Sequence, residues 1–242
     1  MTKHERLPPV RTQVKNGILL ALPELEFRRI IPHLIFVQLR LGQVLYNADN
    51  WIECAYFMNS GMASLDVVSA DGETVEIGLV GKEGAMGIQA ALGENRMFYS
   101  GVVQIPGNAM RIRSNVLRYV FQNNAEFSRL SSQYMHDLHL QIGQSAVCNH
   151  LHSLEQRLCR CLLASQDHAG LLERLPVTEE FLSHMTDATR SGIMLATAAL
   201  EKVGLISCRR SGIRIINRPE IEARACKCFR VITEKSGRLS EA

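Results

Sequence analysis

Basic side chains that could neutralise phosphate gather in one stretch near the C-terminal end of the 242-residue chain. Between Thr189 and Arg218 the only acidic residue is Glu201, and the six basic residues are Arg190, Lys202, Arg209, Arg210, Arg214 and Arg218. Residues 1–150 carry 13 basic and 13 acidic side chains, so the overall charge of +3 hides a local basic patch. Such a patch favours binding to a nucleic-acid backbone, the alternative being an arginine-rich hairpin on an ordinary helical domain.

The residues around this patch predict the elements that would position it. Apolar spacing predicts a helix over 179–185 with Thr178 as its N-cap, and a second helix over 190–203 with Thr189 as its N-cap. Gly204 stands where a left-handed C-cap residue belongs, and an arginine-containing hairpin follows. Two short helices joined by about 3 or 4 residues form a helix-turn-helix, whose second helix can enter a DNA major groove.

The cysteines and histidines do not follow a metal-binding pattern along the chain. The seven cysteines are odd in number and irregular in spacing, which indicates reduced thiols. Neither Cys159-Arg-Cys161 nor Cys226-Lys-Cys228 has the usual zinc spacing, and residues two apart on a helix diverge. Core or surface thiols are favoured, with metal ligation or redox sensing as the alternative. We predict no metal site, and interpret four histidines as polar interface groups: His136, His139, His150 and His152.

The length of 242 residues indicates two domains, each able to bury its own core. The hydrophobic content of 46% is that of an ordinary globular protein. The charged start Met1–Arg6 is not followed by an apolar segment, and no apolar run approaches the roughly 18 residues of a membrane span. We therefore expect a cytoplasmic protein with no membrane partner. The common nucleotide-binding, metalloprotease and hydrolase motifs are absent from the sequence, so we expect no enzyme.

The N-terminal two-thirds changes from strand to helix. After a helical lead-in over 19–31, short β-branched or aromatic runs predict strands over 34–41, 43–46, 54–58, 63–68, 74–80, 101–105 and 109–112. Turns are predicted at Ser60-Gly61 and at Pro106-Gly107-Asn108, and a glycine-rich turn over 81–87 precedes a short helical segment over 88–92. Such a turn can face backbone N–H groups toward an anion.

A long helical segment follows from Ser114 to about His152. Its narrow apolar stripe suits a seam between two helices, and we predict a dimer interface formed by Met135, Leu138, Ile142 and Ala146. The alternative is a helix packed only on its own domain. Gly143 and Ser145 at the seam keep that alternative open.

The order of these parts resembles the Crp/Fnr superfamily of bacterial transcription regulators over nearly the whole chain. The matching stretches are Arg40–Tyr46, Tyr56–Met62, Asp71–Val80, Gly84-Ala-Met-Gly87 and Thr189-Arg-Ser191. The resemblance implies an α+β fold: a sensor β-roll over 1–120, a dimerisation helix and hinge over 121–152, and a winged helix-turn-helix over 153–242. It also implies a homodimer on a two-fold-related DNA site, with RNA polymerase as a partner. A signalling or scaffold module that binds a ligand and a protein partner is the competing hypothesis.

Within this resemblance, the cyclic-nucleotide site is degenerate. Ile88 and Gln89 stand where the family's ribose-binding glutamate is expected, and Tyr99 stands where its phosphate-binding arginine precedes a retained Ser100. Arg96 lies three residues out of register. A buried phosphate without its charged partner is costly, so we expect a pocket lined by Gly84, Gly87, Ile88, Gln89, Arg96, Tyr99 and Ser100 that does not bind cyclic AMP tightly.

The resemblance also bears on other cofactors. The first cysteine is Cys54, so the N-terminal cysteine cluster of the family's iron–sulfur members is missing. His33 and Cys54 leave a haem ligand open, but a different small ligand in the roll, or no ligand at all, is favoured. The sequence does not identify the signal, the target DNA, or whether the protein activates or represses.

DNA contacts follow from the resemblance as well. Arg190 takes the position that reads guanine, and its planar fork suits O6 and N7 of that base; the alternative is a phosphate contact only. Leu195 replaces a second arginine of the cyclic AMP receptor pattern and offers only apolar contact. The full predicted DNA-binding set is Thr189, Arg190, Ser191, Met194, Leu195, Lys202, Arg209, Arg210 and Arg214. The segment 218–231 is predicted as an added helix started by Pro219, and neither it nor its Cys226 and Cys228 has a function that the sequence reveals.

Overall fold

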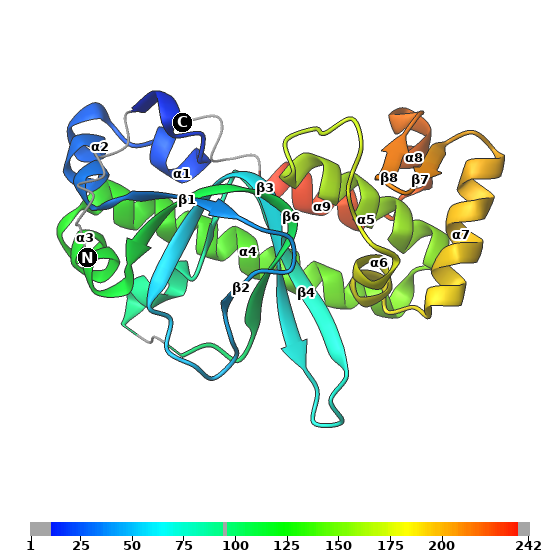
Figure 1. Cartoon of the computed structure of the whole chain (residues 1–242), viewed down its shortest axis with the longest axis horizontal. Coiled ribbons are helices and arrows are strands. Elements are labelled where there is room, and N and C mark those ends of the chain that lie inside the picture. The colour runs from blue at the N-terminus through cyan, green and yellow to red at the C-terminus, as the bar shows by residue number, and fades with distance from the viewer. Residues whose placement is uncertain (1–10, 94–95, 237–242) are drawn as a thin grey trace.

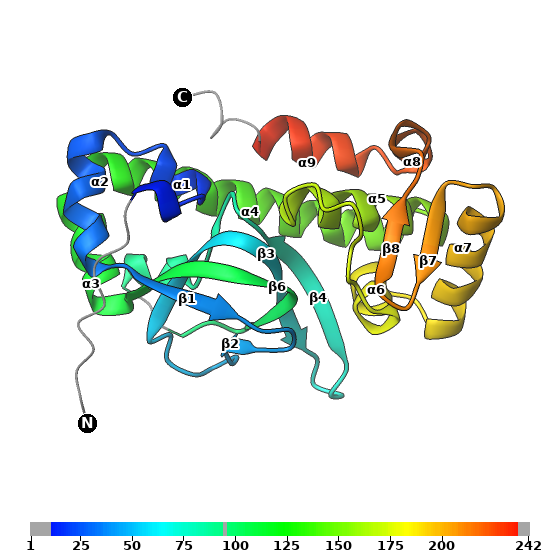
Figure 2. The same ribbon diagram turned by 45° about the horizontal axis from the view of Figure 1, so that its top comes forward.

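The computed structural model describes residues 11–93 and 96–236 (Figure 1). The charged start Met1–Arg6, on which the expectation of a cytoplasmic protein partly rests, lies outside the described residues. A β-roll occupies one end of the molecule and a helical domain with a small hairpin the other, and the long helix α4 (Ala125–Leu151) runs along the roll toward the helical domain (Figures 1 and 2). None of the helices in the described ranges is both long and apolar enough to span a bilayer.

The β-roll is built from six antiparallel strands. These are β1 (Ile35–Leu39), β2 (Val44–Tyr46), β3 (Cys54–Val68), β4 (Thr74–Val80), β5 (Ala85–Met86) and β6 (Ser100–Arg113). The strand order is β1-β6-β3-β4, with β2 paired to β6 and β5 to β3. The short helices η1 (Arg11–Gln13), α1 (Gly17–Leu20), α2 (Glu24–Ile30) and η2 (Ile31–His33) precede it, and η3 (Ile88–Leu92) follows β5.

The two turns predicted inside the strands are wrong. The strands β3 and β6 run continuously through Ser60-Gly61 and Pro106-Gly107-Asn108, and their pairing shifts register between Met58 and Ala63. A Cβ on Gly61 would lie 2.5 Å from the Ile105 carbonyl oxygen, and one on Gly107 would lie 2.2 Å from the Ser60 oxygen. The glycines therefore mark a bulge where two long strands approach closely, because only glycine leaves room there.

The helix predicted from Ser114 to His152 is divided in two. Helix α3 (Ser114–Asn123) ends before Asn124, whose side chain then accepts a hydrogen bond from Phe127 N (2.9 Å) and caps α4. Apolar side chains of both helices enter the core of the roll, including Leu117, Phe127 and Leu130. As a result the N-terminal half of α4 belongs structurally to the roll.

The C-terminal domain follows after a very short link. Helix α5 (Leu154–His168) starts with a capping box in which Ser153 and Gln156 satisfy each other's backbone N–H groups. Next come α6 (Glu179–Thr186), α7 (Arg190–Lys202), β7 (Ile206–Arg209), β8 (Gly212–Ile215), α8 (Arg218–Arg224) and α9 (Cys228–Ser236). The single added helix predicted for 218–231 is therefore two helices. Pro219 does lie in the first turn of α8, but the helix ends at Arg224 and the next begins at Cys228.

Candidate DNA-binding surface and sensor site

Helices α6 and α7 form the predicted helix-turn-helix. Thr178 Oγ1 accepts from Phe181 N (3.0 Å), and Thr189 Oγ1 accepts from Gly192 N (3.1 Å), so each helix has its predicted N-cap. Asp187, in the turn between them, adopts a left-handed conformation with φ 47°. The apolar sides of both helices are buried, with Phe181, Leu182, Met185, Ile193 and Leu200 in the core of the domain. This packing fixes which side of α7 faces outward.

The outward side of α7 carries four of the predicted DNA-binding residues. Arg190 and Ser191 are exposed at its N-terminal end, and Met194 and Leu195 are 55% and 74% exposed. Arg190 lies 3.3 Å from Glu180 in an exposed ion pair, which is worth about 0–1 kcal/mol and does not hold the guanidinium firmly. Thr189 is used as the N-cap, so its hydroxyl positions the helix. Figure 1 shows α7 at the outer edge of the molecule, away from the roll.

The hairpin β7–β8 lies beside α7 as a wing. Arg209 and Arg210 are exposed at its tip, and Lys202 is exposed at the end of α7. Gly212 packs tightly against the loop between α5 and α6: a Cβ on Gly212 would lie 1.9 Å from the Leu175 carbonyl oxygen. In addition, Leu175 pairs with Ile213 as an isolated antiparallel β-bridge. The wing is thus held firmly with its arginines outward.

Two further basic residues of the patch form ion pairs. Arg214 is exposed and lies 3.1 Å from Glu173. Arg218 is half-buried and lies 2.8 Å from both Asp167 and Glu222. Arg218 therefore joins α5 to α8, which is a structural role, and counting it in the basic patch overstates the exposed positive charge.

Tyrosines fill the predicted sensor pocket. Tyr99 is only 3% exposed and its ring lies 6.3 Å from that of Tyr46, which is also buried. Tyr134 of α4 reaches the same region of the roll, because a Cβ on Gly84 would lie 2.2 Å from its ring. Burial raises the pKa of all three phenols, so each is neutral at physiological pH.

The other predicted pocket residues are engaged elsewhere or buried. Ile88 is fully buried in the core of the roll, and Gly87 holds a left-handed φ of 73° at the start of η3. Ser100 Oγ accepts a hydrogen bond from Ala48 N (2.9 Å). Arg96 is exposed and its guanidinium lies 4.9 Å from the centre of the Trp51 ring. Gln89 is half-buried. The seven predicted residues thus do not converge on a charged anion site.

Three of the four predicted dimer residues pack inside the protomer. Met135 and Leu138 are 6% and 4% exposed in the core of the roll, and Ile142 packs against that core. Of the four, Ala146 alone is exposed. The interpretation of this stripe as the dimer seam is therefore corrected for Met135 and Leu138, because the β-roll covers them, while Ile142 is half-buried. Another side of α4 is more open and carries His136, Leu140, Gly143, Val147 and Leu151.

The roll contacts the C-terminal domain through a half-buried ion pair. Glu83 Oε1 lies 2.8 Å from His168 Nδ1 at the end of α5, and also accepts from Gly81 N (2.8 Å). Gln141 of α4 completes the contact, with Nε2 at 3.1 Å from His168 Nε2 and Oε1 accepting from Leu79 N. Burial opposes both charges, but the mutual attraction and hydrogen bond outweigh it, so the pKa of Glu83 is lowered and that of His168 is raised.

A second contact between the domains contains a buried carboxyl group. Glu76 of β4 is 2% exposed; its Oε1 accepts from Gln104 Nε2 (3.4 Å) and lies 3.9 Å from His184 Nδ1 of α6. Burial, with repulsion from Asp66 and Glu180, raises the pKa of Glu76 to about 10. The group is therefore protonated at neutral pH, and no sequence pattern marks it.

A cluster of potential metal ligands lies where α4 meets the segment before α9. Cys148, His152, Cys226 and Cys228 place their ligand atoms within 4.8 Å of one another. Spacing along the chain relates only nearby residues, so it does not pair the end of α4 with the start of α9. The other cysteine pair, Cys159 and Cys161, is buried in the helical core.

Comparison with known protein families matches two parts of the chain. A model of the cyclic nucleotide-binding domain matches residues 36–124, and a model of the Crp-like helix-turn-helix domain matches residues 156–224. No curated protein sequence matches. The fold and the outward-facing basic helix define a DNA-binding regulator with a sensor-type roll. The chain belongs to the Crp/Fnr family of transcriptional regulators.

Solved structures of the family share the fold at low sequence identity. FixK2 from Bradyrhizobium japonicum is 11% identical with a TM-score of 0.70, covering 80% of this chain and 98% of that protein. A CRP-family regulator from Thermus thermophilus is 14% identical with a TM-score of 0.65, covering 78% and 96%. The c-di-GMP responsive global regulator CLP from Xanthomonas campestris is 13% identical with a TM-score of 0.66, covering 81% and 100%.

Proposed function

We propose that the protein is a homodimeric transcription regulator that binds a two-fold-related DNA site in response to a signal other than cyclic AMP. The outward side of α7 carries this proposal, because Arg190 and Ser191 are exposed there beside a wing with three exposed arginines, Arg209, Arg210 and Arg214. Arg190 suits a guanine edge, while Arg209 and Arg210 suit phosphates. A contact with RNA polymerase is part of the proposal only through the family resemblance.

The dimer is proposed to form along the more open side of α4. His136, Leu140, Gly143, Val147 and Leu151 recur at steps of four and three residues, which is the spacing of a two-helix seam. Val147 and Leu151 are 45% and 68% exposed in the protomer. Two copies packed in parallel along this side would present two α7 helices to successive major grooves.

The roll is proposed to have lost cyclic-nucleotide binding. The buried side chains of Tyr99, Tyr46 and Tyr134 support this proposal, and by the family resemblance Tyr99 stands where the phosphate-binding arginine is expected. The Xanthomonas regulator responds to c-di-GMP, so c-di-GMP is a ligand to test on this chain.

The test is selection of binding sites from randomised double-stranded DNA with the purified full chain. We expect a two-fold-related consensus, and an affinity that falls steeply between about 50 and 200 mM salt, as roughly six or more phosphate contacts would require. Cyclic AMP at millimolar concentration should leave the affinity unchanged. A consensus without two-fold symmetry, or an affinity that does not fall with salt, would reject the proposal.

A further inference from the structure

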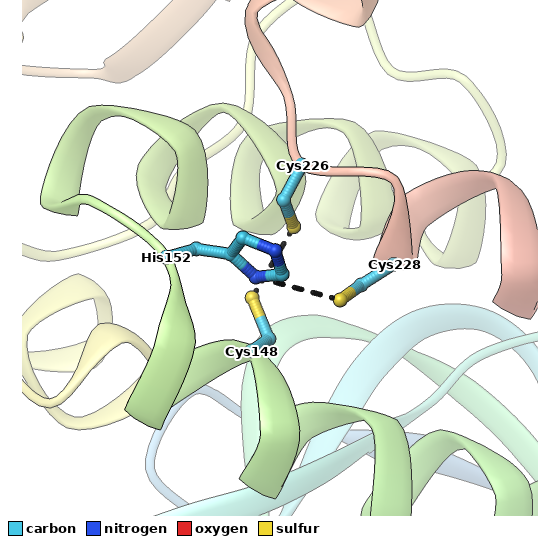
Figure 3. Close-up of side chains that lie close together, drawn as sticks. All are labelled: Cys148, His152, Cys226 and Cys228. Carbon is cyan, nitrogen blue, oxygen red and sulfur yellow. Dashed lines mark hydrogen bonds between the residues drawn. The ribbon is translucent and has the colours of Figure 1, made fainter.

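Three cysteines and one histidine converge on a single point at the hinge between the two domains. Cys148 and His152 are four residues apart at the end of α4 and so share a face, while Cys226 lies just before α9 and Cys228 is its first residue. The Sγ atoms of Cys148 and Cys226 are 3.3 Å apart, and Cys228 Sγ is 3.6 Å from His152 Nδ1. Figure 3 shows the four side chains pointing toward one another from α4 and from the segment that leads into α9.

The spacing of the four atoms fits one tetrahedral ion. Zinc lies about 2.3 Å from cysteine sulfur and about 2.0–2.1 Å from histidine nitrogen, so neighbouring ligands of a tetrahedral site are about 3.5–3.8 Å apart. The distance from Cys228 to His152 lies in that range, and the distance from Cys148 to Cys226 is slightly shorter. Because all four atoms lie within 4.8 Å of one another, they are too close to hold separate irons around a core of sulfides.

The surrounding charge fits an ionised set of ligands. Arg160 is 2% exposed and its Nε donates to Cys148 Sγ (3.1 Å), while its Nη2 has no hydrogen-bond partner among the described residues. Zn²⁺ with three thiolates and a neutral histidine carries a net charge of −1 by formal count, which one guanidinium balances. Beside three neutral thiols the same guanidinium would be a buried charge without a counterion, which is costly. Gln144 Nε2 donates to Cys228 Sγ (3.0 Å) as a second stabilising contact.

The backbone explains why a Cys-x-Cys pair converges here. Two cysteines two residues apart diverge on a helix, but α8 ends at Arg224, Ala225 is extended with φ −66° and ψ 152°, and α9 begins only at Cys228. Cys226 therefore lies in the segment before the helix, where it is free of the helical spacing. All three cysteines are at most 3% exposed.

We propose that Cys148, His152, Cys226 and Cys228 form a structural zinc site that fastens α9 to the end of α4. Binding releases the thiol protons to solvent, and no oxidation or reduction is involved. The four ligands close the coordination shell, so the site stabilises structure without an open position for catalysis. The inference does not depend on the proposed DNA-binding function, because it concerns metal content and the packing of α9.

The first test measures the metal content of the full chain. The protein would be expressed without a histidine tag and analysed by plasma mass spectrometry. We expect one zinc per chain, and replacement by Co²⁺ should give the visible bands of a tetrahedral thiolate complex. Stoichiometric iron with sulfide, a Cys148–Cys226 disulfide in protein purified without reductant, or no metal after zinc supplementation would each overturn the proposal.

Variants then assign the ligands. Cys228→Ser and His152→Ala should lose zinc or bind it at least about 10-fold more weakly, whereas His152→Cys should retain it because a fourth thiolate also suits zinc. Cys208→Ser and Cys54→Ser, at half-buried cysteines outside the cluster, are the matched controls and should keep one zinc. Arg160→Gln should weaken binding about 10–100-fold with the ligands intact. Full zinc content and unchanged affinity in Cys228→Ser would contradict the assignment.

Discussion

At the scale of single residues, the basic patch separates into side chains with different tasks. Arg190 and Arg209 are exposed, whereas Arg218 is held between Asp167 and Glu222. Charge along the sequence groups these residues in one patch. The pattern could not show that Arg218 is engaged in ion pairs, because its partner Asp167 lies 51 residues upstream. Its other partner, Glu222, lies one helical turn downstream.

Arg190 and Arg209 should differ in what their loss does to DNA binding. Arg190→Ala should cost about 1–3 kcal/mol on the preferred site and flatten the preference at one base of each half-site. Arg209→Ala should weaken binding to all DNA sequences alike. It should also reduce the slope of log affinity against log salt concentration by about one. Binding titrations on matched and mismatched duplexes at several salt concentrations measure both effects. Equal loss of preference in the two variants would contradict the assignment.

Glu76 should make the protein less stable as the pH rises. Its folded-state pKa is about 10, above the ordinary value of 4.5, so its contribution to stability is greatest below pH 4.5 and is lost progressively up to about pH 10. Glu76→Gln keeps the shape without the charge. We expect it to stabilise the fold by roughly 1–3 kcal/mol at pH 7 and to have little effect at pH 4.

Thermal unfolding of wild type and Glu76→Gln across this pH range checks the expectation. Glu73 is an exposed carboxylate at the tip of the β3–β4 hairpin, so Glu73→Gln is the matched exposed control. It should leave stability unchanged at every pH. If the wild type proved more stable than Glu76→Gln at pH 8, the carboxylate would be stabilising and the account wrong.

At the scale of elements, local patterns predicted the C-terminal helices well and the long strands less well. Thr178, Thr189 and Gly204 mark helix ends through contacts with residues three positions away, so the sequence contains the signal. The glycines at 61 and 107 resemble turn residues. Their real role is a close approach between β3 and β6, which are far apart in the chain, and a single sequence does not reveal which strands will meet.

The same limit explains the error on α4. The stripe containing Met135 and Leu138 is apolar because it meets the roll, and a stripe that meets a partner helix would look alike. The cysteine cluster escaped prediction for a related reason, since Cys148 and Cys226 are 78 residues apart in the chain and only the tertiary fold brings them together.

The contact between the 81–84 turn and α5 should depend on pH. The ionised Glu83 stabilises the folded state fully above its ordinary pKa of 4.5, and this stabilisation is lost as the pH falls through its lowered pKa. Protonated His168 contributes fully below pH 6.5, and this contribution is lost as the pH rises through its raised pKa. NMR titration of the His168 ring should give a pKa above 6.5. In Glu83→Gln that pKa should fall, and an unchanged value would reject the pairing.

At the scale of the whole molecule, the more open side of α4 should control assembly. Val147→Glu places a charge in the proposed seam and should convert the dimer to a monomer, because two such charges would face each other across the two-fold axis. Sedimentation or light scattering measures the change. Val68→Glu, at a 54% exposed valine of the β3–β4 hairpin, is the control and should remain dimeric. Dimers that survive Val147→Glu would place the interface elsewhere.

Between α4 and α5 the chain has only His152 and Ser153, and His152 is one of the four converging ligands. Any rotation of the DNA-binding domain about this link must therefore alter the geometry at His152. By thermodynamic reciprocity, if DNA favours one hinge angle and changes the affinity for zinc by some factor, zinc changes the affinity for DNA by the same factor. With zinc bound at the hinge and DNA selecting one hinge angle, metal availability and promoter occupancy would become interdependent quantities.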